Sequence, residues 1–212
     1  YNGGGLVRTA QLFADLMGRN RFASDILSVT RFRPSKASFN ETRNFQPQPQ
    51  SVAPTRIAFI TTGASASASE LVINAMIPYL GTNMALVGSN SYGKPVGQYG
   101  FDRAACDDRI RIVAFSTENA AGNADYYNGL AGSVANSCQA PDDITLPLGD
   151  PAEASTARAL GFLAGAACTP VSSTSSATVV AQRTAVPVGE RARELLMPDR
   201  PTPAQREVPG SF

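Results

Sequence analysis

The stretch from Ser65 to Lys94, SASASELVINAMIPYLGTNMALVGSNSYGK, decides the fold of this 212-residue chain. A turn rich in serine and alanine leads into residues 71–80, whose apolar positions predict a helix that Pro78 should end or kink. Residues 84–88 then form a short apolar run, and the β-branched and aromatic run 56–62 precedes the turn. The order strand, helix, strand predicts an α/β fold of βαβ-type units.

Within the core, two further helices are predicted outside this unit. Leu6 to Met17 places apolar residues on one helical face, directly after three glycines. Asp150, followed by Pro151 and Glu153, has the composition of a helix start, with Asp150 as the cap. An apolar stripe continues this last helix to about Gly165.

A β-hairpin is predicted from residues 99–101 and 109–116. Arginine and isoleucine alternate from Arg109 to Ile112, which is typical of a strand with one buried face. The segment 118–132 after it is rich in Asn, Gly and Ala and is predicted to be a loop. Such a loop either lines a substrate cleft or covers the surface without a function.

The domain organisation follows from composition. Residues 1–168 are predicted to form one core, in which the polar segment 19–55 covers the surface and holds a short strand at 26–29. Residues 169–212 are predicted to form a linker and a mostly disordered tail. The tail is divided into a linker, a strand, a short helix and a disordered end, at 169–176, 178–188, 190–196 and 198–212.

Composition excludes several classes of function. The net charge of +1 and the scattered arginines give no electrostatic reason to expect a nucleic acid partner. No apolar run is long enough, at about 18 residues, to predict a membrane span. The sequence has no histidine and no cluster of carboxylates, so neither a metal site nor a cofactor is predicted.

The absence of histidine also limits the choice of catalytic base. A serine nucleophile needs a base, and lysine serves in Ser-Lys variants of the catalytic triad. The chain has only two lysines, and arginine does not lose its proton in proteins. Lys36 lies in a polar, loop-like segment, which leaves Lys94 as the base for a serine in the turn at 65–69. From these serines alone, a helix cap or a packing spacer is the alternative.

Three motifs in register resemble those of the carboxyl-terminal processing, or tail-specific, proteases. Asn2 to Gly5 matches a glycine-rich N-x-G-G turn, Ser65 to Glu70 matches the S-A-S-A-S-E helix start, and Gly93 to Gln98 matches a G-K-x-x-x-Q loop. The resemblance covers about residues 1–165. It implies a ClpP- or crotonase-like core that further strands before Tyr1 would complete.

The resemblance implies a serine endopeptidase with a Ser-Lys dyad. Ser67, the middle serine, corresponds to the nucleophile and Lys94 to the general base, while Gln98 orients the lysine. Ser91 stands where a threonine is frequent in the family. The distance in sequence between Ser67 and Lys94 is about two residues longer than usual, which the turn at 82–83 can absorb.

The same resemblance assigns the groups around the nucleophile. The backbone N–H of Ala68 and one from the glycine turn form the oxyanion hole, for which Gly5 is favoured over Gly4. Glu70 corresponds to the motif glutamate, with a structural role at least as well founded as a catalytic one. A lysine acts as a base in its neutral form, which apolar surroundings favour; Val87, Tyr92, Pro95 and Val96 are the sequence neighbours available for this.

The implied partners are protein or peptide substrates, without a cofactor or metal. Family members act in the bacterial periplasm or cell envelope or in the chloroplast lumen, and many carry a PDZ domain before the core. Two alternatives stay open: a catalytically silent peptide-binding homologue, and an acyl transferase on a related scaffold.

Three cysteines, Cys106, Cys138 and Cys168, leave their pairing ambiguous. A Cys106–Cys138 disulfide would close the segment between them and indicate an oxidising compartment. The alternative is three unpaired thiols.

Overall fold

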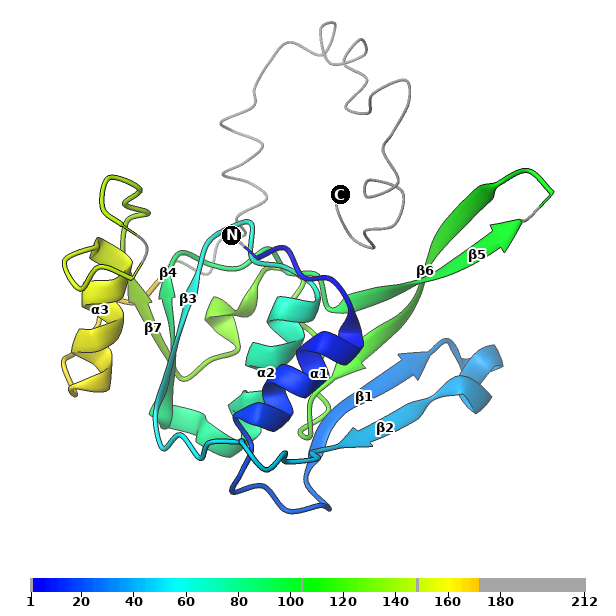
Figure 1. The fold of residues 1–212 in the computed structure, drawn as a ribbon, viewed down its shortest axis with the longest axis horizontal. Coiled ribbons are helices and arrows are strands. Elements are labelled where there is room, and N and C mark those ends of the chain that lie inside the picture. Colours follow the sequence, from blue (N-terminus) through cyan, green and yellow to red (C-terminus); the bar gives the residue numbers. More distant parts are fainter. Residues whose placement is uncertain (1, 104, 148, 172–212) are drawn as a thin grey trace, which may run out of the picture.

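The computed structural model describes residues 2–103, 105–147 and 149–171, which form two β-sheets and three α-helices (Figure 1). The strand and helix predicted at 178–188 and 190–196 lie outside the described residues. None of the described helices is both long enough and apolar enough to span a membrane.

The first sheet is parallel and confirms the predicted α/β fold. Its strands β3 (Ile57–Thr61), β4 (Met84–Gly88) and β7 (Asn136–Gln139) lie in that order, and α2 (Ala68–Leu80) connects the first two. β7 was not predicted, because its sequence NSCQ carries no apolar pattern and pairing with β4 alone makes it a strand. α2 continues through Pro78 to Leu80, so the proline lies in its last turn without ending it.

The two faces of β4 bury alternate residues against different helices. Met84 and Leu86 belong to the main apolar cluster, which α2 and α1 share. Ala85 and Val87 belong to a second cluster with residues of α3 (Ala154–Leu163). This alternation with period two places α2 and α3 on opposite faces of the parallel sheet.

The second sheet is antiparallel and has the strand order β2-β1-β6-β5. It consists of β1 (Ile26–Phe32), β2 (Glu41–Asn44), β5 (Val96–Arg103) and β6 (Asp108–Glu118). The short strand predicted at 26–29 is confirmed as part of β1, but β2 was not predicted, so residues 19–55 contain a β1–β2 hairpin rather than one short strand. The many polar residues of this hairpin concealed the alternation of apolar and polar residues that indicates a strand, because one face of the hairpin stays open to solvent.

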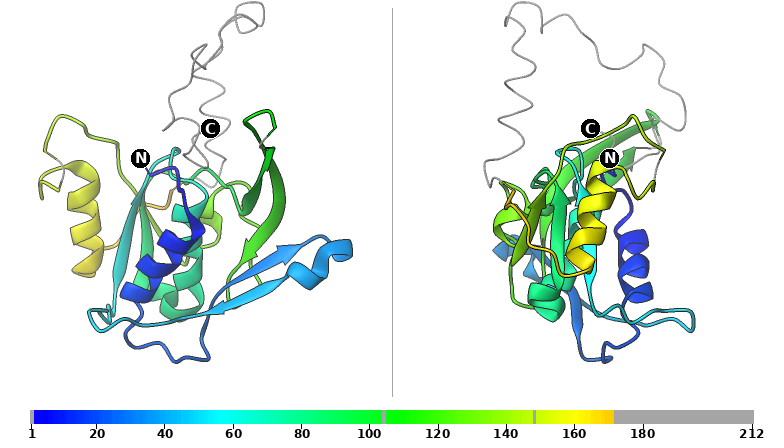
Figure 2. Two further views of the ribbon diagram at one scale, coloured as in Figure 1. Left: turned by 45° about the vertical axis from the view of Figure 1, so that its right-hand side comes forward. Right: turned by 90° about the vertical axis from the view of Figure 1, so that its left-hand side faces the viewer.

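The β5–β6 hairpin confirms the predicted pairing but not the predicted burial. β1 pairs with only the last four residues of β6, Phe115 to Glu118. The rest of the β5–β6 hairpin therefore projects from the body (Figures 1 and 2). Ile110 is 63% exposed and Ile112 is 50% exposed. The alternating pattern correctly indicated a strand, but no described element covers its apolar face.

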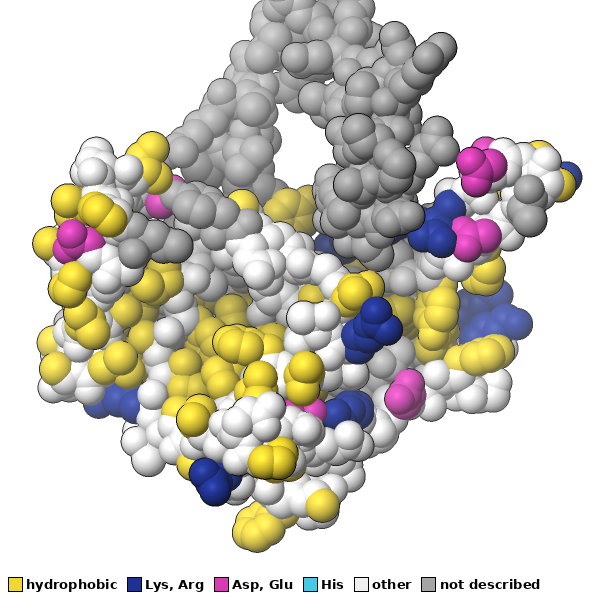
Figure 3. Space-filling view, viewed as in Figure 1, with side chains coloured by type: hydrophobic (Ala, Val, Ile, Leu, Met, Phe, Trp, Pro, Cys, Tyr) yellow, Lys and Arg dark blue, Asp and Glu magenta, His cyan; other side chains and the backbone are white. Residues whose placement is uncertain are grey.

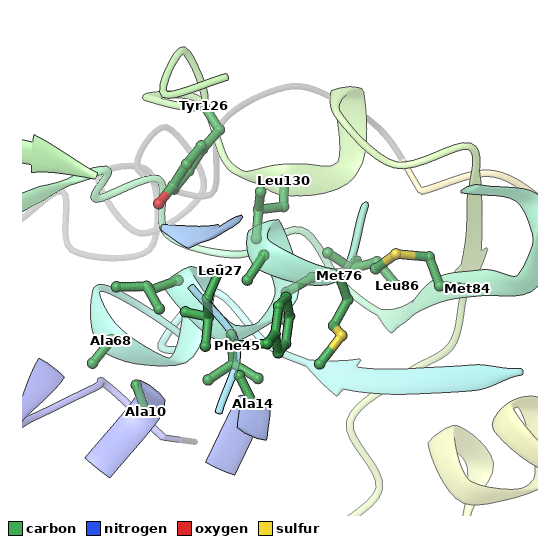
Figure 4. Packing of buried hydrophobic residues seen from close by; sticks show 14 residues of the cluster. Ala10, Ala14, Leu27, Phe45, Ala68, Met76, Met84, Leu86, Tyr126 and Leu130 are labelled. Atoms are coloured by element: carbon green, nitrogen blue, oxygen red, sulfur yellow. The ribbon is translucent and has the colours of Figure 1, made fainter. Parts of the chain in front are cut away.

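α1 (Val7–Leu16) packs against α2 and closes the main core, part of which Figure 4 shows. Ala10 and Ala14 are buried at this contact, so the two helix backbones approach closely. Asp15 ties the end of α1 to β2 and to the chain that follows it: its carboxylate pairs with Arg43 of β2 at 2.6 Å and accepts the Gln46 N–H at 2.7 Å.

The start of α3 differs by a few residues from the prediction. Glu153, not Asp150, caps the helix, because its carboxylate accepts the N–H groups of Ser155 and Thr156 at 2.9 and 2.7 Å. Asp150 instead accepts the N–H of Ala152 at 2.8 Å, within the preceding turn. These hydrogen bonds lower the pKa of Glu153.

The predicted Cys106–Cys138 pairing is wrong. Cys138, at the end of β7, forms a disulfide with Cys168, which follows α3, and their Cα atoms lie 4.7 Å apart. Cys106 is free and exposed at the tip of the projecting hairpin, where it cannot reach β7. The disulfide thus fastens the chain after α3 to the parallel sheet.

Replacing Cys138 or Cys168 by serine should lower the free energy of unfolding by about 3–4 kcal/mol, the value for a closed loop of about 30 residues. Chemical denaturation measures this loss. Cys106→Ser is the matched control and should change stability little, because that side chain is exposed. Equal stability of all three variants under oxidising conditions would contradict the pairing.

Candidate active site

Ser67 lies at the turn between β3 and α2, immediately before the first helical residue. Its backbone has φ 58° and ψ −119°, a region that residues other than glycine rarely adopt. Such strained strand-to-helix turns present catalytic nucleophiles in other folds. The turn is held by Ser65, whose hydroxyl accepts the N–H of Thr62 at 3.1 Å and whose carbonyl accepts the N–H of Tyr92 at 2.9 Å.

Glu70 is fully buried in the first turn of α2, and its carboxylate joins the serine turn to the lysine loop. Oε2 accepts the N–H groups of Ser67 at 2.9 Å and Lys94 at 2.8 Å, while Oε1 accepts the N–H of Gly93 at 2.7 Å. One side chain therefore fixes the backbone of both residues that the sequence singled out for catalysis.

Lys94 lies in the loop between β4 and β5 and is held from both sides. Its own N–H is bound by Glu70, and the carbonyl of the next residue, Pro95, accepts the N–H of Thr117 from β6 at 2.9 Å. β5 begins two residues later, at Val96. The backbone at the lysine is thus positioned by both the parallel-sheet unit and the antiparallel sheet.

A cavity of about 220 Å³ brings the predicted residues together. Ser67, Lys94, Gln98 and Gly5 all line it, although they come from three segments that are far apart in sequence. The other lining residues come from α1, its preceding turn and the β5–β6 hairpin: Leu6, Val7, Gly97, Gly100, Arg109, Arg111 and Phe115.

The glycine turn lies against the serine turn and separates this cavity from a larger hollow. A β-carbon at Gly4 would lie only 2.8 Å from the Ala68 nitrogen and 2.9 Å from Ser67 Cβ, so this contact requires glycine. Gly4 also has φ +101°, which favours glycine. Its N–H donates to Asn2 Oδ1 at 3.0 Å, whereas Gly5 lines the cavity.

The larger hollow, about 670 Å³, lies between α1, β3 and α2. It has mainly apolar walls, and Figure 3 shows apolar side chains gathered between α1 and β3. Gly4 and Ala68 line this hollow but not the smaller cavity, while Gly5 and Leu6 line both.

Two of the predicted supporting residues do not line the cavity. Ser91 is fully buried outside the cavity, and its hydroxyl accepts the N–H of Leu130 at 2.9 Å. Tyr92 is 49% exposed and does not line the cavity, whose apolar lining residues are Leu6, Val7 and Phe115. Sequence neighbours of a lysine on a tight loop need not be its neighbours in space.

The loop 118–132 does not line the cavity but supports the lysine loop from behind. Asn90 donates to the carbonyl of Asn128 at 2.7 Å and accepts the N–H of Ala131 at 2.9 Å. Tyr126 is buried in the main core, and burial raises the pKa of its hydroxyl. The segment therefore packs behind the lysine loop, and none of its residues lines either hollow.

The sequence did not identify Arg109 and Arg111 as cavity residues. Their alternation with isoleucine was interpreted only as a strand pattern. What reveals them is the pairing of β6 with β5, which places Arg111 opposite Gly100 on the side of Gln98. Within residues 2–103, 105–147 and 149–171, no three or more Cys, Asp or Glu side chains form a cluster suited to a metal ion.

No protein-family model matches the chain, and neither does any curated protein. Solved structures do match its fold. A protein from Bacteroides fragilis described as an S41 protease has a TM-score of 0.66 and 25% identity, over 78% of this chain and 43% of that chain.

Two further structures are more distant. The photosystem II D1 C-terminal processing protease has a TM-score of 0.48 and 18% identity, over 65% of this chain and 32% of that chain. A lipoprotein from Streptococcus agalactiae has a TM-score of 0.43 and 15% identity, over 62% and 45%. The chain spans less than half the length of each of these proteins. At the level of the fold, it is similar to part of an S41 protease.

Glu70→Gln should destabilise the fold by about 2 kcal/mol or more, because a side-chain amide offers donors where backbone N–H groups need acceptors. Glu118→Gln is the matched control: Glu118 pairs with the half-exposed Arg31, and its loss should cost at most about 1 kcal/mol. Urea denaturation of both variants provides the comparison. Similar losses in the two would contradict the central role of Glu70.

Gly4→Ala should lower the melting temperature and alter the serine turn, because the new methyl group meets Ala68 and Ser67. Gly132→Ala is the control, since a β-carbon there meets nothing within 4 Å. Amide hydrogen exchange at residues 65–70 should increase only in the first variant. Unchanged exchange in Gly4→Ala would show that the two turns are not coupled.

Proposed function

We propose that this chain is the catalytic part of a serine endopeptidase of the C-terminal processing type, with a Ser67–Lys94 dyad. One observation carries the proposal: Ser67, Lys94, Gln98 and Gly5 line a single cavity. The fold similarity to an S41 protease supports the general class of protease, and the motifs support the dyad.

In the proposed mechanism, neutral Lys94 accepts the hydroxyl proton of Ser67 as Oγ attacks the substrate carbonyl carbon. The carbonyl π electrons move to oxygen, and a tetrahedral oxyanion forms. Lys94 then donates the proton to the leaving amine as the C–N bond breaks. In the second half of the reaction, Lys94 accepts a proton from a water molecule as the water oxygen attacks the ester carbonyl carbon. When this tetrahedral intermediate collapses, the bond between the acyl carbon and Ser67 Oγ breaks, the carboxylic acid product leaves, and Lys94 returns the proton to Oγ.

The N–H groups of Ala68 and Gly5 are proposed to donate hydrogen bonds to the oxyanion. Ala68 is the first residue of α2, and the first N–H groups of a helix have no acceptor within the helix. The helix dipole favours negative charge at the same place. Gly5 is preferred over Gly4, because the Gly4 N–H already donates to Asn2.

Gln98 is proposed to orient Lys94, and Glu70 to position both catalytic residues through their backbones. Gln98 lies at the start of β5 beside a register irregularity between Gly97 and itself, which breaks the regular pairing where the cavity begins. The three hydrogen bonds that the Glu70 carboxylate accepts all come from backbone N–H groups, which supports a structural function rather than proton transfer.

We also propose an oxidising location, such as the periplasm or cell envelope. The Cys138–Cys168 disulfide supports it, because structural disulfides persist in oxidising compartments and are rare in the cytosol.

Ser67→Ala, Lys94→Ala and Lys94→Arg should each reduce peptide hydrolysis by at least about 10³-fold, because each removes the nucleophile or the base. Lys36→Arg is the control and should retain activity, since Lys36 is exposed and outside the cavity. Release of a fluorophore from a quenched peptide measures the rates, and a fluorophosphonate probe should label only chains with Ser67 and Lys94.

Three results would contradict the proposal in different ways. Activity that survives in Lys94→Arg would contradict the assignment of Ser67 and Lys94 as a catalytic dyad. Peptide binding without hydrolysis or labelling would identify a silent peptide-binding homologue. Turnover of thioesters but not peptides would identify an acyl transferase.

A further inference from the structure

A third hollow, of about 370 Å³, lies at the end of the parallel sheet where β3 and β7 begin. It is bounded by Arg56, directly before β3, by the start of β7 and by the chain that follows α3. α3 and β7 lie on the side of the molecule opposite the β5–β6 hairpin, which forms a wall of the cavity at Ser67 (Figure 1). No residue that lines this hollow lines either of the two hollows near Ser67. It is therefore separate from the candidate active site.

Arg56 is held in this hollow by stacking. Its guanidinium carbon lies 4.1 Å from the centre of the Phe162 ring, and that ring is buried at the end of α3. Stacking occupies one face of the guanidinium plane, whereas the N–H donors point outward within the plane. The group is thus fixed in orientation without the use of its hydrogen-bond donors.

The positive charge of Arg56 has no counter-charge in residues 2–103, 105–147 and 149–171, where none of the ion pairs includes it. Its Nε is buried without a hydrogen-bond partner. A buried donor without an acceptor costs about 1–3 kcal/mol, so an arginine with a purely structural role normally has one. Arg56 as a whole is only half-buried, so a ligand in the hollow can reach the other guanidinium N–H groups and neutralise the charge.

The opposite wall of the hollow is rigid. The Cys138–Cys168 disulfide fastens the chain after α3 to β7, and the Ser137 hydroxyl accepts the N–H of Val171 at 3.0 Å. Ser137, Cys168 and Val171 all line the hollow. Because the Ser137 oxygen acts as an acceptor in this contact, its own hydrogen remains available to a ligand. The hollow is preformed, and it offers a second donor besides the arginine.

Charge and size restrict the ligand. Arg56 is the one charged residue that lines the hollow in the part of the chain that the structure describes, so it matches a single negative charge. The nearby end of α3 carries the negative end of the helix dipole, which disfavours a multiply charged anion such as phosphate. Alanines from both walls, among them Ala135 and Ala167, leave room for a short apolar body.

We propose that this hollow is a second binding site, which takes a small monocarboxylate through Arg56 and the Ser137 hydroxyl. The carboxylate belongs either to a free short-chain acid or to the C-terminal residue of a peptide. Both sources present the same planar group, which a guanidinium binds with two parallel hydrogen bonds. The inference does not depend on the proposed function, because the site shares no residue with the cavity at Ser67.

The test titrates the full 212-residue chain, ¹⁵N-labelled and with its disulfide intact, and follows the amide resonances by NMR. The probes are propanoate, N-acetylalanine, neutral N-acetylalaninamide and inorganic phosphate. We expect the two carboxylates to shift the resonances of residues 135–137 and 166–168, and to bind about tenfold more tightly than the neutral amide. Tighter binding of N-acetylalanine than of propanoate identifies a peptide terminus, and the reverse order identifies a free acid.

Substitutions assign the preference to Arg56. Arg56→Gln should reduce the ratio of N-acetylalanine to N-acetylalaninamide affinity to about one. Arg56→Lys keeps the charge but loses the paired donors, so it should retain part of the ratio, and it provides the measurement if Arg56→Gln does not fold. Arg158→Gln is the matched control: it removes an exposed arginine of α3 that lies outside the hollow, and the ratio should persist.

The inference is overturned if the carboxylates and the neutral amide bind equally, or if no probe shifts these resonances at millimolar concentrations. A preference that persists in Arg56→Gln, or that is complete in Arg56→Lys, would also overturn the assignment to a guanidinium. Phosphate that binds more tightly than both carboxylates would contradict the proposed ligand class. None of these measurements requires turnover, so they leave the test of the Ser67–Lys94 dyad independent.

Discussion

The arrangement of the candidate site depends on one buried carboxylate. Glu70 accepts three backbone N–H groups, from the serine turn and from the lysine loop, while its own backbone belongs to the first turn of α2. A group with no exposure cannot exchange these donors for water, so the two loops are tied to each other at a fixed separation. This contact therefore fixes the backbone of Ser67 relative to that of Lys94.

Around that contact, the protein combines two sheets with different functions. The parallel sheet, with α2 on one face and α3 on the other, provides a rigid support on which the serine turn is built. The antiparallel sheet provides the lysine loop at its margin and, through the β5–β6 hairpin, a wall that extends beyond the body of the protein (Figure 1). The cavity lies where the two meet, a common location for binding sites.

Glycines at this junction act through the space that they leave. Gly4 lets the first turn lie against Ser67 and Ala68, and Gly97 lies where a side chain would collide with the ring of Phe115. Gly100 lies under the side chain of Arg109, whose Cδ would be 3.4 Å from a β-carbon at that position.

The local elements could be predicted from sequence because their patterns are local. Apolar periodicity identified α1, α2 and β4, and the motifs identified Gly5, Ser67, Lys94 and Gln98, which line one cavity. Where a pattern depends on a partner, prediction was wrong or absent. β7 is a strand only because it pairs with β4, and Cys138 pairs with Cys168 only because the chain after α3 returns to the parallel sheet. The residue that caps α3 is Glu153, three residues after the predicted Asp150.

The sequence by itself determined the α/β class and predicted Lys94 as the base for a serine nucleophile, because the chain contains no histidine, arginine keeps its proton, and the other lysine, Lys36, lies in a polar segment. Only the tertiary structure decided what surrounds that lysine. Strand pairing, not sequence distance, sets which side chains share a face, and so it brought Arg109 and Arg111 to the cavity and left Tyr92 at the surface. Long-range contacts of this kind are not encoded in any short stretch of the chain.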